Sequence, residues 1–428
     1  MSTHLPHIVV LGAGFGGLSF AKEFPSEHAR ITVVDRQNHH LFQPLLYQVA
    51  TAGLAAPDIA QPIRSMLRKK PNLTVILADV TGIDLAKREV RLADGQLHYD
   101  YLVLALGSQT SYFGKNEWEQ FAPGLKTLDD AVLLRRNMLL AYEKAERETD
   151  AEKRRALMTT VVVGGGPTGV ELAGSFAELA QTVLYRDFDH IDPRQARILL
   201  VEGGPRLLGT FEPPLSASAQ QQVESLGVEV RVNTRVTAIR EGEVDLGTET
   251  IRAGNIVWAA GVAAVPLTQT LGVELDRAGR IKVQSDFSLP GHPHVFAIGD
   301  LASLVDAKGV VVPGVAQGAI QPGAHVAKLI ADELRGGPAL RLKREPFAYW
   351  DKGNMATIGR THAIAQIGKV QLSGLSAWLA WLGLHLFFLI GFRNRISVLI
   401  QWTYSYFTYQ RGARIIMGLG DRPPAEKK

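Results

Sequence analysis

Two glycine-rich fingerprints, 152 residues apart, constrain this chain more than any other feature. Residues 12–17 read GAGFGG and residues 164–169 read GGGPTG, and a run rich in β-branched residues precedes each of them. Glycines at this spacing allow a tight strand-to-helix turn, and the helix N-terminus that follows favours the charge of a pyrophosphate. Two such units predict two bound dinucleotides, and two dinucleotides held in one protein indicate electron transfer between them.

An acidic residue ends the second predicted strand of each unit. Asp35 follows the run 31–34, and Glu202 follows the run 197–201. A carboxylate in this place holds a ribose hydroxyl in dinucleotide-binding domains. Because the Glu202 carboxylate would accept from a 2′-hydroxyl and repel a 2′-phosphate, the sequence predicts NADH over NADPH. Asp35 could also be a surface turn residue, and this alternative stays open.

Apolar runs between and after these units complete the predicted fold. Residues 101–107 and 295–298 are apolar without interruption, which is typical of buried parallel strands. The predicted fold class is α/β, with two Rossmann-like dinucleotide-binding domains and a C-terminal membrane-associating helical region. The expected boundaries are 1–113 and 281–340 for the first domain, 114–280 for the second and 341–428 for the C-terminal region. A helix is predicted over 127–150 with Thr127 as its N-cap, followed by a polar boundary at 150–158.

The C-terminal region is both basic and apolar. Residues 341–428 hold 13 Lys/Arg and 4 Asp/Glu, whereas the rest of the chain holds 33 and 38. Within this region, 372–392 carries no Lys, Arg, Asp or Glu over 21 residues, and 396–410 carries none over 15. A positive, aromatic and apolar segment fits a lipid bilayer surface better than a nucleic acid. Three interpretations follow: in-plane membrane anchoring, a single membrane span over 372–392, or a soluble core or dimer interface.

The chain contains no cysteine. This excludes disulfides, thiolate metal sites and thiol-based redox chemistry. No group of His, Asp and Glu has convincing metal-ligand spacing, so no metal site is predicted. The N-terminus enters the first predicted strand without a signal-peptide h-region, and the dinucleotide-binding domains are therefore expected in the cytoplasm.

Polar residues also follow the late apolar run and the next predicted helix. Asp300 ends the run at 295–298, where a carboxylate can hold a sugar-like hydroxyl chain or act as a helix N-cap. On the helix predicted after Gly314, Gln317 and Gln321 are four residues apart and share one face. Pro322 is expected to kink or restart this helix.

Taken together, these motifs resemble one family. The chain resembles the type II NADH dehydrogenases, single-subunit NADH:quinone oxidoreductases of the two-dinucleotide-binding-domain flavoprotein superfamily, whose fold is pyridine nucleotide-disulfide oxidoreductase-like. The resemblance covers nearly the whole chain. It rests on Gly12–Gly17, the stretch HHLFQPLLYQ at 39–48, Gly164–Gly174, AIGD at 297–300, Ala316-Gln317 with Gln321, and the aromatic and basic C-terminus.

The resemblance implies roles for individual residues. The FAD site would comprise Gly12, Gly14, Gly17, Asp35, Val80, Gly107, Asp300, Ala316 and Gln317. The NADH site would comprise Gly164, Gly166, Gly169, Glu171, Glu202 and Gly261. Gln317 and Gln321 would border the quinone pocket. Glu171 would orient the nicotinamide carboxamide or couple to protons, although it could also be a first-turn helix acid that the helix dipole favours.

The implied activity is transfer of hydride from NADH to FAD and then of two electrons to a membrane quinone, without proton pumping. The enzyme would be a peripheral, monotopic protein of the respiratory chain at the cytoplasmic face of the inner (cell) membrane, and a homodimer through the C-terminal region is a further expectation. Two alternatives are a soluble NAD(P)H-dependent flavoprotein reductase of the ferredoxin-reductase type and a non-catalytic FAD- and NADH-binding redox sensor. Sulfide:quinone oxidoreductase is nearly excluded because it needs redox cysteines.

Overall fold

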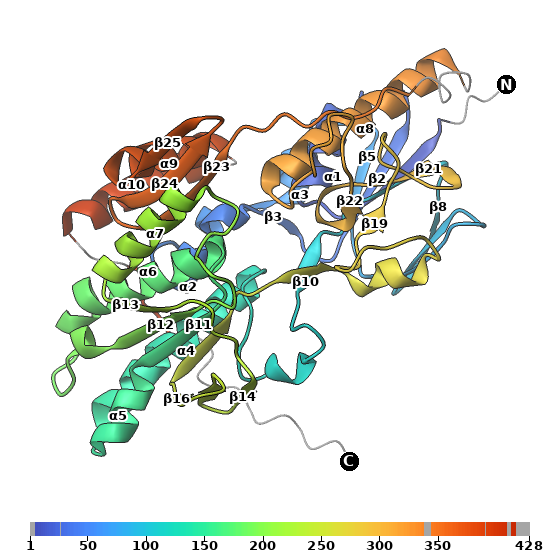
Figure 1. Ribbon diagram of the computed structural model, residues 1–428. Helices are drawn as coiled ribbons and strands as arrows, with labels where there is room; N and C mark the ends of the chain where they lie inside the picture. Colours follow the sequence, from blue (N-terminus) through green and yellow to red (C-terminus); the bar gives the residue numbers. More distant parts are fainter. Residues whose placement is uncertain (1–4, 26, 338–343, 390, 409–411, 417–428) are drawn as a thin grey trace. The chain divides into compact units, whose positions relative to one another are not determined.

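The computed structural model describes residues 5–25, 27–337, 344–389, 391–408 and 412–416. The chain divides into two compact units, and each contains its own parallel sheet (Figure 1). The first unit comprises residues 1–41, 60–109 and 262–352, and the second comprises 42–59, 110–261 and 353–428. The division into four segments made from the sequence stays a prediction.

The sheet of the first unit has the strand order β20-β21-β9-β1-β2-β5. Its strands are β1 (His7–Leu11), β2 (Arg30–Asp35), β5 (Leu73–Leu77), β9 (Tyr101–Leu104), β20 (Ser288–Leu289) and β21 (His292–Ala297). All neighbours pair in parallel except β20 with β21. The central strand β1 is buried at every residue, as its apolar sequence requires. Helices α1 (Phe15–Glu23) and α8 (Ala316–Gly336) pack together where Gly323 faces the backbone of Gly16.

The sheet of the second unit has the order β13-β12-β11-β17, and all its neighbours are parallel. Its strands are β11 (Thr159–Val163), β12 (Arg197–Val201), β13 (Val228–Arg231) and β17 (Asn255–Trp258). Its helices are α2 (Leu46–Ala50), α4 (Leu128–Arg147), α5 (Ala151–Leu157), α6 (Pro167–Thr182) and α7 (Pro213–Ser225). Both sheets place the strand before the fingerprint at or next to the centre, as in doubly wound nucleotide-binding folds. The predicted α/β fold class is therefore confirmed.

The second unit also contains the C-terminal elements, in which three antiparallel strands carry two helices (Figure 1). These elements are β23 (Asn354–Gly359), β24 (His362–Ile367), β25 (Val370–Ser373), α9 (Leu375–Phe388) and α10 (Phe392–Thr408). Of the three interpretations of 372–392, the single membrane span is wrong, because Ser373 still pairs with Ile364 and α9 has only 14 residues. None of the described helices is long and apolar enough to cross a membrane. Residues 409 and 410 of the second uncharged run lie outside the described part.

Three local expectations concern helices. The stretch 150–158, predicted as a polar boundary, contains helix α5 at 151–157, and the Asp150 side chain caps it by accepting from the backbone N–H groups of Glu152 and Lys153. Helix α8 does not restart at Pro322 but continues through it, and a kink there stays a prediction. Thr127 caps α4 as predicted, accepting from the Asp130 backbone N–H at 3.1 Å.

Short strands and turns connect these elements. The remaining strands are β3 (His39–Leu41), β4 (Ala60–Pro62), β6 (Val80–Asp84), β7 (Glu89–Leu92), β8 (Gly95–His98), β10 (Ser108–Thr110), β14 (Ala238–Arg240), β15 (Glu243–Asp245), β16 (Thr250–Arg252), β18 (Val262–Ala264), β19 (Ile281–Lys282) and β22 (Ala302–Ser303). The remaining helical turns are η1 (Gln43–Leu45), η2 (Ala56–Asp58), α3 (Ile63–Leu67), η3 (Asn116–Trp118), η4 (Leu184–Arg186), η5 (Pro193–Gln195), η6 (Pro266–Thr270) and η7 (Gly299–Leu301).

Candidate active site

The first glycine turn joins β1 to α1 in the first unit. Gly12 has a φ of 97°, and a Cβ there would lie 2.7 Å from the carbonyl carbon of Ala105, so a side chain is excluded. Gly14 is the N-cap of α1, it has no side chain to cap the helix, and it faces open space. The first N–H groups of α1 therefore lack a side-chain acceptor, and the turn is shaped to receive an anion.

Asp35 binds this turn directly. Its Oδ2 accepts from the Ala13 backbone N–H at 2.6 Å, and its Oδ1 accepts from the Gln37 backbone N–H at 2.8 Å. Desolvation raises the pKa of the Asp35 carboxyl, while the two backbone hydrogen bonds act in the opposite direction. Asp35 is therefore tied to the glycine turn at the end of β2 and is not a solvated surface residue. A ribose hydroxyl could still use the remaining lone pairs of the carboxylate.

Several buried polar side-chain atoms in the first unit have no hydrogen-bond partner among the described residues, and two of them test whether a flavin nucleotide fits. These two are the Nε2 atom of His40 and the Oε1 atom of Gln317. His40 Nδ1 donates to the carbonyl of Ala13 at 2.9 Å, and burial lowers the pKa of its imidazole to about 4. Buried polar atoms are almost always hydrogen-bonded. A dinucleotide with hydroxyl, phosphate and amide groups can supply both missing partners, so the residues present fit FAD.

His40 is a candidate cofactor contact to which the sequence analysis gave no role. It lies on β3, five residues after Asp35, and its ring meets that of Phe15 edge-on at 5.1 Å. Phe15 belongs to the first fingerprint. The signal available in the sequence was the stretch HHLFQPLLYQ at 39–48, which supported the resemblance without a role for His40.

The other predicted FAD residues lie at several places in the first unit. Ser108 donates to Asp300 Oδ2 at 2.6 Å, and Gly107, with a φ of 72°, precedes Ser108. Asp300 lies within η7, whose N-cap is Ile298, so the alternative role as a helix N-cap is wrong. Val80 begins β6, outside the six-stranded sheet. Ala316 is the first residue of α8, and no side chain caps that helix end.

Gln321 is engaged within the protein. Its Nε2 donates to the Trp350 carbonyl at 2.9 Å, and its Oε1 accepts from the Trp350 backbone N–H at 3.0 Å. The side chain of Trp350 is itself exposed. Gln321 thus holds a backbone segment in place, whereas Gln317, one turn earlier on α8, keeps its buried carbonyl oxygen unpaired among the described residues. The two glutamines therefore differ in what they offer to a ligand.

The second glycine turn repeats the first in the second unit. Gly164 has a φ of 113°, and a Cβ there would lie 2.5 Å from the carbonyl carbon of Ala259. Gly166 is the uncapped N-cap of α6 and faces open space. Glu202 accepts from the Gly165 backbone N–H through Oε2 and from the Gly204 backbone N–H through Oε1, both at 2.6 Å. Each unit thus has the same device, in which an acid at a strand end holds the glycine turn.

Glu171 lies on α6 and faces the C-terminal strands. Desolvation raises the pKa of its carboxyl well above the usual range, although a hydrogen bond from the Thr357 backbone N–H acts in the opposite direction. The carboxyl is therefore held in its neutral form more strongly than an exposed glutamate. An acid whose only role is to interact with the helix dipole would stay in contact with water, so its carboxyl would not be desolvated.

The C-terminal helices bind the segment 42–59 within the second unit. Ser397 and Gln401 of α10 donate to the buried Asp58, each at 2.9 Å. Trp402 donates through Nε1 to Gln48 Oε1 at 2.8 Å. The polar side of α10 therefore faces the protein.

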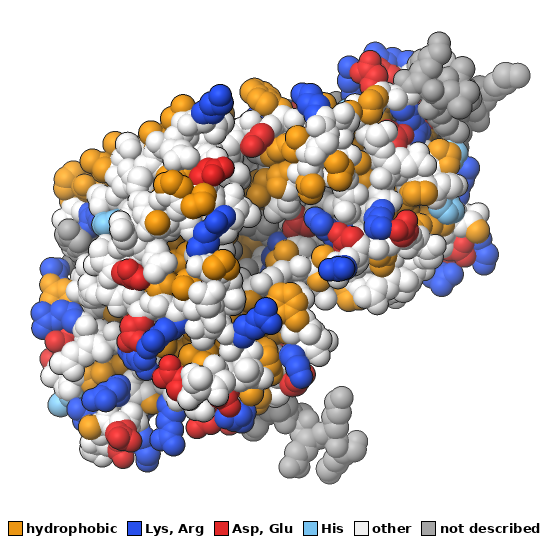
Figure 2. All heavy atoms as spheres, in the orientation of Figure 1, with side chains coloured by type: hydrophobic (Ala, Val, Ile, Leu, Met, Phe, Trp, Pro, Cys, Tyr) orange, Lys and Arg blue, Asp and Glu red, His pale blue; other side chains and the backbone are white. Residues whose placement is uncertain are grey.

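The opposite side of α10 is apolar and exposed. The large exposed apolar residues of α9 and α10 are Leu375, Leu379, Leu384, Phe387, Phe392, Ile396, Leu399, Ile400, Tyr404, Tyr406 and Phe407. Hydrophobic side chains are visible on the surface of these C-terminal elements in Figure 2. In a soluble amphipathic helix the apolar side faces the protein and the polar side faces water, whereas in α10 the two sides are exchanged. Among the described residues, no group of three or more His, Asp or Glu could hold a metal ion.

Comparisons with known proteins agree with this geometry. The model of the pyridine nucleotide-disulphide oxidoreductase family matches residues 6–323. A type II NADH:quinone oxidoreductase of Mycobacterium tuberculosis is 46% identical over 419 residues, which cover 95% of this chain and 89% of that protein. A second such enzyme of the same organism is 45% identical over 425 residues, covering 96% and 89%.

The fold is also that of NDH2 from Plasmodium falciparum, solved in complex with NADH. The TM-score is 0.87 at 20% identity, covering 96% of this chain and 100% of that chain. The chain is therefore a member of the type II NADH:quinone oxidoreductases, within the pyridine nucleotide-disulphide oxidoreductase family.

Proposed function

We propose that this protein oxidises NADH, passes the electrons through a bound FAD and reduces a quinone, without pumping protons. The observation that carries the proposal is the repeated device of the two units. In each unit a glycine turn ends in an uncapped helix, and an acid holds the turn through its backbone. Two dinucleotides of a single enzyme would need two such sites. The close relatives from Mycobacterium tuberculosis are named for NADH and quinone, which supports the same pair of substrates here.

In this proposal the first unit binds FAD and the second binds NADH. The unpaired polar atoms of His40 and Gln317 favour the first unit for FAD, and Glu202 favours a free ribose hydroxyl in the second. Bound FAD would accept a hydride and release electrons singly or in pairs. The uncapped N-terminus of α8 would stabilise negative charge that develops nearby, and Gln317 at its first turn would orient the ring system.

Glu171 is proposed to hold a proton beside the bound nicotinamide. Its carboxyl is desolvated and accepts from the Thr357 backbone N–H, which fixes its direction. A neutral carboxyl can donate a hydrogen bond to a carboxamide, whereas a carboxylate can only accept. Gln317 and Gln321 are proposed to border the quinone pocket, Gln317 by direct contact and Gln321 by holding the Trp350 segment.

We further propose that the protein lies on the cytoplasmic face of the cell membrane and takes its quinone from the bilayer. The support is the reversed amphipathicity of α10, whose Ser397 and Gln401 face the protein while Ile400 and Phe407 are exposed. Apolar side chains in this number on two adjacent helices exceed what a soluble monomer normally exposes. The predicted homodimer would use the same surface and is the competing occupant.

A stopped-flow experiment tests the electron pathway. Purified holoprotein should lose its visible flavin absorbance on mixing with NADH and regain it on mixing with a soluble quinone. A redox sensor would bind NADH without rapid bleaching, and a ferredoxin-reductase type enzyme would bleach but not be reoxidised by quinone. A protein isolated without flavin and unable to take it up would contradict the proposal.

Flotation with anionic lipid vesicles tests the membrane proposal. The double variant Ile400→Ser/Phe407→Ser should lose vesicle binding, whereas Leu77→Ser, an exposed leucine at the end of β5, should bind like the parent. If the double variant floats normally and instead changes from dimer to monomer in light scattering, the surface is a dimer interface and the membrane proposal fails.

A further inference from the structure

A tight turn in the second unit carries an aromatic residue where the backbone disfavours one. The Lys115 backbone N–H donates to the Tyr112 carbonyl at 3.0 Å, which closes a four-residue turn. The two central residues, Phe113 and Gly114, both have positive φ, at 52° and 86°. Positive φ at both central positions defines a type I′ turn, in which Asn, Asp or Gly normally occupies the first of them. Phe113 is therefore in a conformation that costs free energy for a residue with a bulky side chain.

Burial in the folded protein does not offset this cost. The Phe113 side chain is 70% exposed. A hydrophobic ring usually stabilises a fold by leaving water, and this ring does so only slightly. Neither the turn type nor the core explains a phenylalanine at this position, so the observed outlier indicates a function outside the folding of the chain.

The ring of Phe113 lies over Gly261 and against Trp258. A Cβ on Gly261 would come within 2.8 Å of Phe113 Cζ, so the ring could keep this position only over a glycine and would have to turn aside for a side chain. The Phe113 and Trp258 rings meet edge-on with their centroids 6.2 Å apart.

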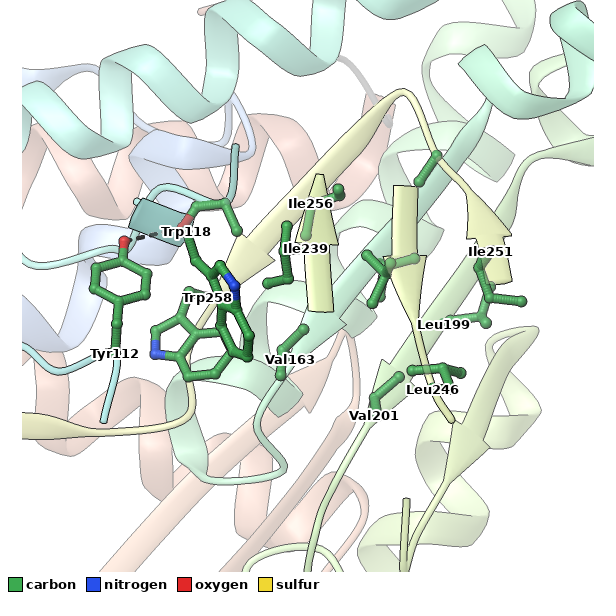
Figure 3. Close-up of a cluster of buried hydrophobic side chains, with 14 residues drawn as sticks. Tyr112, Trp118, Val163, Leu199, Val201, Ile239, Leu246, Ile251, Ile256 and Trp258 are labelled. Carbon is green, nitrogen blue, oxygen red and sulfur yellow. Dashed lines mark hydrogen bonds between the residues drawn. The ribbon is translucent and has the colours of Figure 1, made fainter. Parts of the chain in front are cut away.

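Trp258 itself is fixed in position. Its indole ring is stacked on Tyr112 and meets Trp118 edge-on, with both centroid distances 5.5 Å (Figure 3). Its Nε1 donates to the Ser111 carbonyl at 2.8 Å. Figure 3 shows these three rings gathered at one end of the hydrophobic cluster that also contains Val163. Phe113 therefore rests on a rigid aromatic base.

This base lies beside the second glycine turn. Trp258 is the last residue of β17, and the next residue, Ala259, donates through its backbone N–H to the Val163 carbonyl at 2.7 Å. The same Ala259 packs against Gly164, where the fingerprint begins. Ligands of parallel sheets bind at the carboxyl ends of the strands, next to this turn. Phe113 is thus an exposed aromatic ring at the edge of the dinucleotide site.

We propose that Phe113 is a binding residue for the nicotinamide nucleotide. The Phe113 ring packs on the bound dinucleotide beside Gly261 and becomes buried on binding. The inference rests on the proposed function only in taking the second unit as the NADH site. An aromatic face suits the planar rings and the apolar faces of the riboses of a dinucleotide. A phenylalanine held in advance at the site also loses little conformational freedom on binding, which favours affinity.

Two variants of Phe113 test the inference by separating folding from binding. Phe113→Asn places a residue that the type I′ turn prefers and removes the ring, while Phe113→Tyr keeps the ring. The dissociation constant of NADH should rise about tenfold in Phe113→Asn and stay within about twofold in Phe113→Tyr. Phe113→Asn should melt at the parental temperature or above. In turnover its KM for NADH should rise with little change in kcat, because ring contact is made equally in the ground state and the transition state.

Binding is measured by quenching of tryptophan fluorescence in the flavin-loaded protein under anaerobic conditions after its flavin has been reduced, so no hydride transfer accompanies the titration. The inference is overturned if Phe113→Asn binds NADH with the parental dissociation constant. It is also overturned if the dissociation constant of NADH rises equally in Phe113→Asn and Phe113→Tyr. A parent protein that binds NADH but does not reduce quinone contradicts the proposed function alone. A parent protein that does not bind NADH contradicts both.

Discussion

The contact between α6 and β23 gives the sharpest test of the packing in the second unit. Gly174 lies in the middle of α6, and the position of a Cβ on it is 2.9 Å from the carbonyl carbon of Ile358, with the carbonyl oxygen closer still. A methyl carbon needs roughly 3.5 Å or more from such atoms. Because the carbonyl oxygen is the nearer atom, Gly174→Ala requires α6 and β23 to separate by roughly 1.5–2 Å.

The cost follows from what must move. Overpacking costs about 1–3 kcal/mol, and the upper part of the range applies because the obstacle is the backbone of a paired strand, which cannot swing away as a side chain does. Alanine gains up to about 1 kcal/mol over glycine in a helix interior. We expect a net loss of about 2 kcal/mol in the free energy of unfolding. In a unit of this size the loss corresponds to a melting temperature lower by about 4–8 °C.

Thermal unfolding of the flavin-loaded protein checks this value against a matched control. Gly383 also lies inside a helix, α9, but it is exposed and a Cβ on it meets no atom within 4 Å. Gly383→Ala should therefore keep the parental melting temperature or raise it by a few degrees, since only helix propensity changes. If Gly174→Ala melts no lower than Gly383→Ala, the close approach of α6 to β23 is not part of the folded protein.

Three further predictions concern polar residues. Burial raises the pKa of Glu171 in the folded protein, so Glu171 of the unfolded chain ionises first as the pH rises above about 4.5. Between that pH and the pKa of the folded protein, the free energy of unfolding therefore falls by at most about 1.4 kcal/mol per pH unit. Glu171→Gln cannot ionise, so its melting temperature should exceed the parental one by a margin that grows from pH 5 to pH 8; a constant margin contradicts this. Glu202→Gln removes the negative charge and one of the two oxygens that accept from the glycine turn. The ratio of kcat/KM for NADH to kcat/KM for NADPH should then fall about tenfold. An unchanged ratio would show that Glu202 does not select the cofactor. Gln321→Ala breaks two hydrogen bonds to the Trp350 backbone and should lower the free energy of unfolding by about 1–2 kcal/mol in urea titrations, whereas a parental midpoint would mean that water replaces both bonds.

The dinucleotide-binding folds could be predicted from the sequence because their signals are local. The glycines, the β-branched strands before them and the acids after them lie within about 40 residues in each unit, and the geometry of the turn demands those residue types. Asp35 and Glu202 were expected to hold a ribose. Their hydrogen bonds to Ala13 and Gly165 add that each also holds its own turn.

Residues that depend on long-range contacts were harder to predict. His40 was part of the stretch 39–48 that supported the resemblance but received no role, because nothing local shows that its Nδ1 meets the Ala13 carbonyl. The stretch 372–392 is not one helix, because Ser373 at its start belongs to a strand and pairs with Ile364. The hydropathy of the stretch does not reveal this pairing. The side of α10 that meets the protein depends on Asp58, more than 300 residues earlier, so the uncharged run 396–410 alone could not identify it.

Residues 353–428, which make up most of the predicted membrane-anchoring region, belong to the second unit. Glu171, Gly174 and Glu178 lie along one side of α6, and each meets strand β23 or the turn after it. Glu178 accepts from the backbone N–H of Arg360, whose guanidinium stacks over the ring of Tyr406 on α10 at 4.1 Å.

One helix therefore carries the second fingerprint at its N-terminus and the contacts to the C-terminal strands along its side. Deletion of residues 353–428 would uncover this side of α6 and expose the desolvated carboxyl of Glu171 to water, so it would change the proposed NADH site together with the membrane surface. A truncated protein cannot separate the two functions for this reason. Substitution of exposed residues on α10, which leaves β23 in contact with α6, can do so.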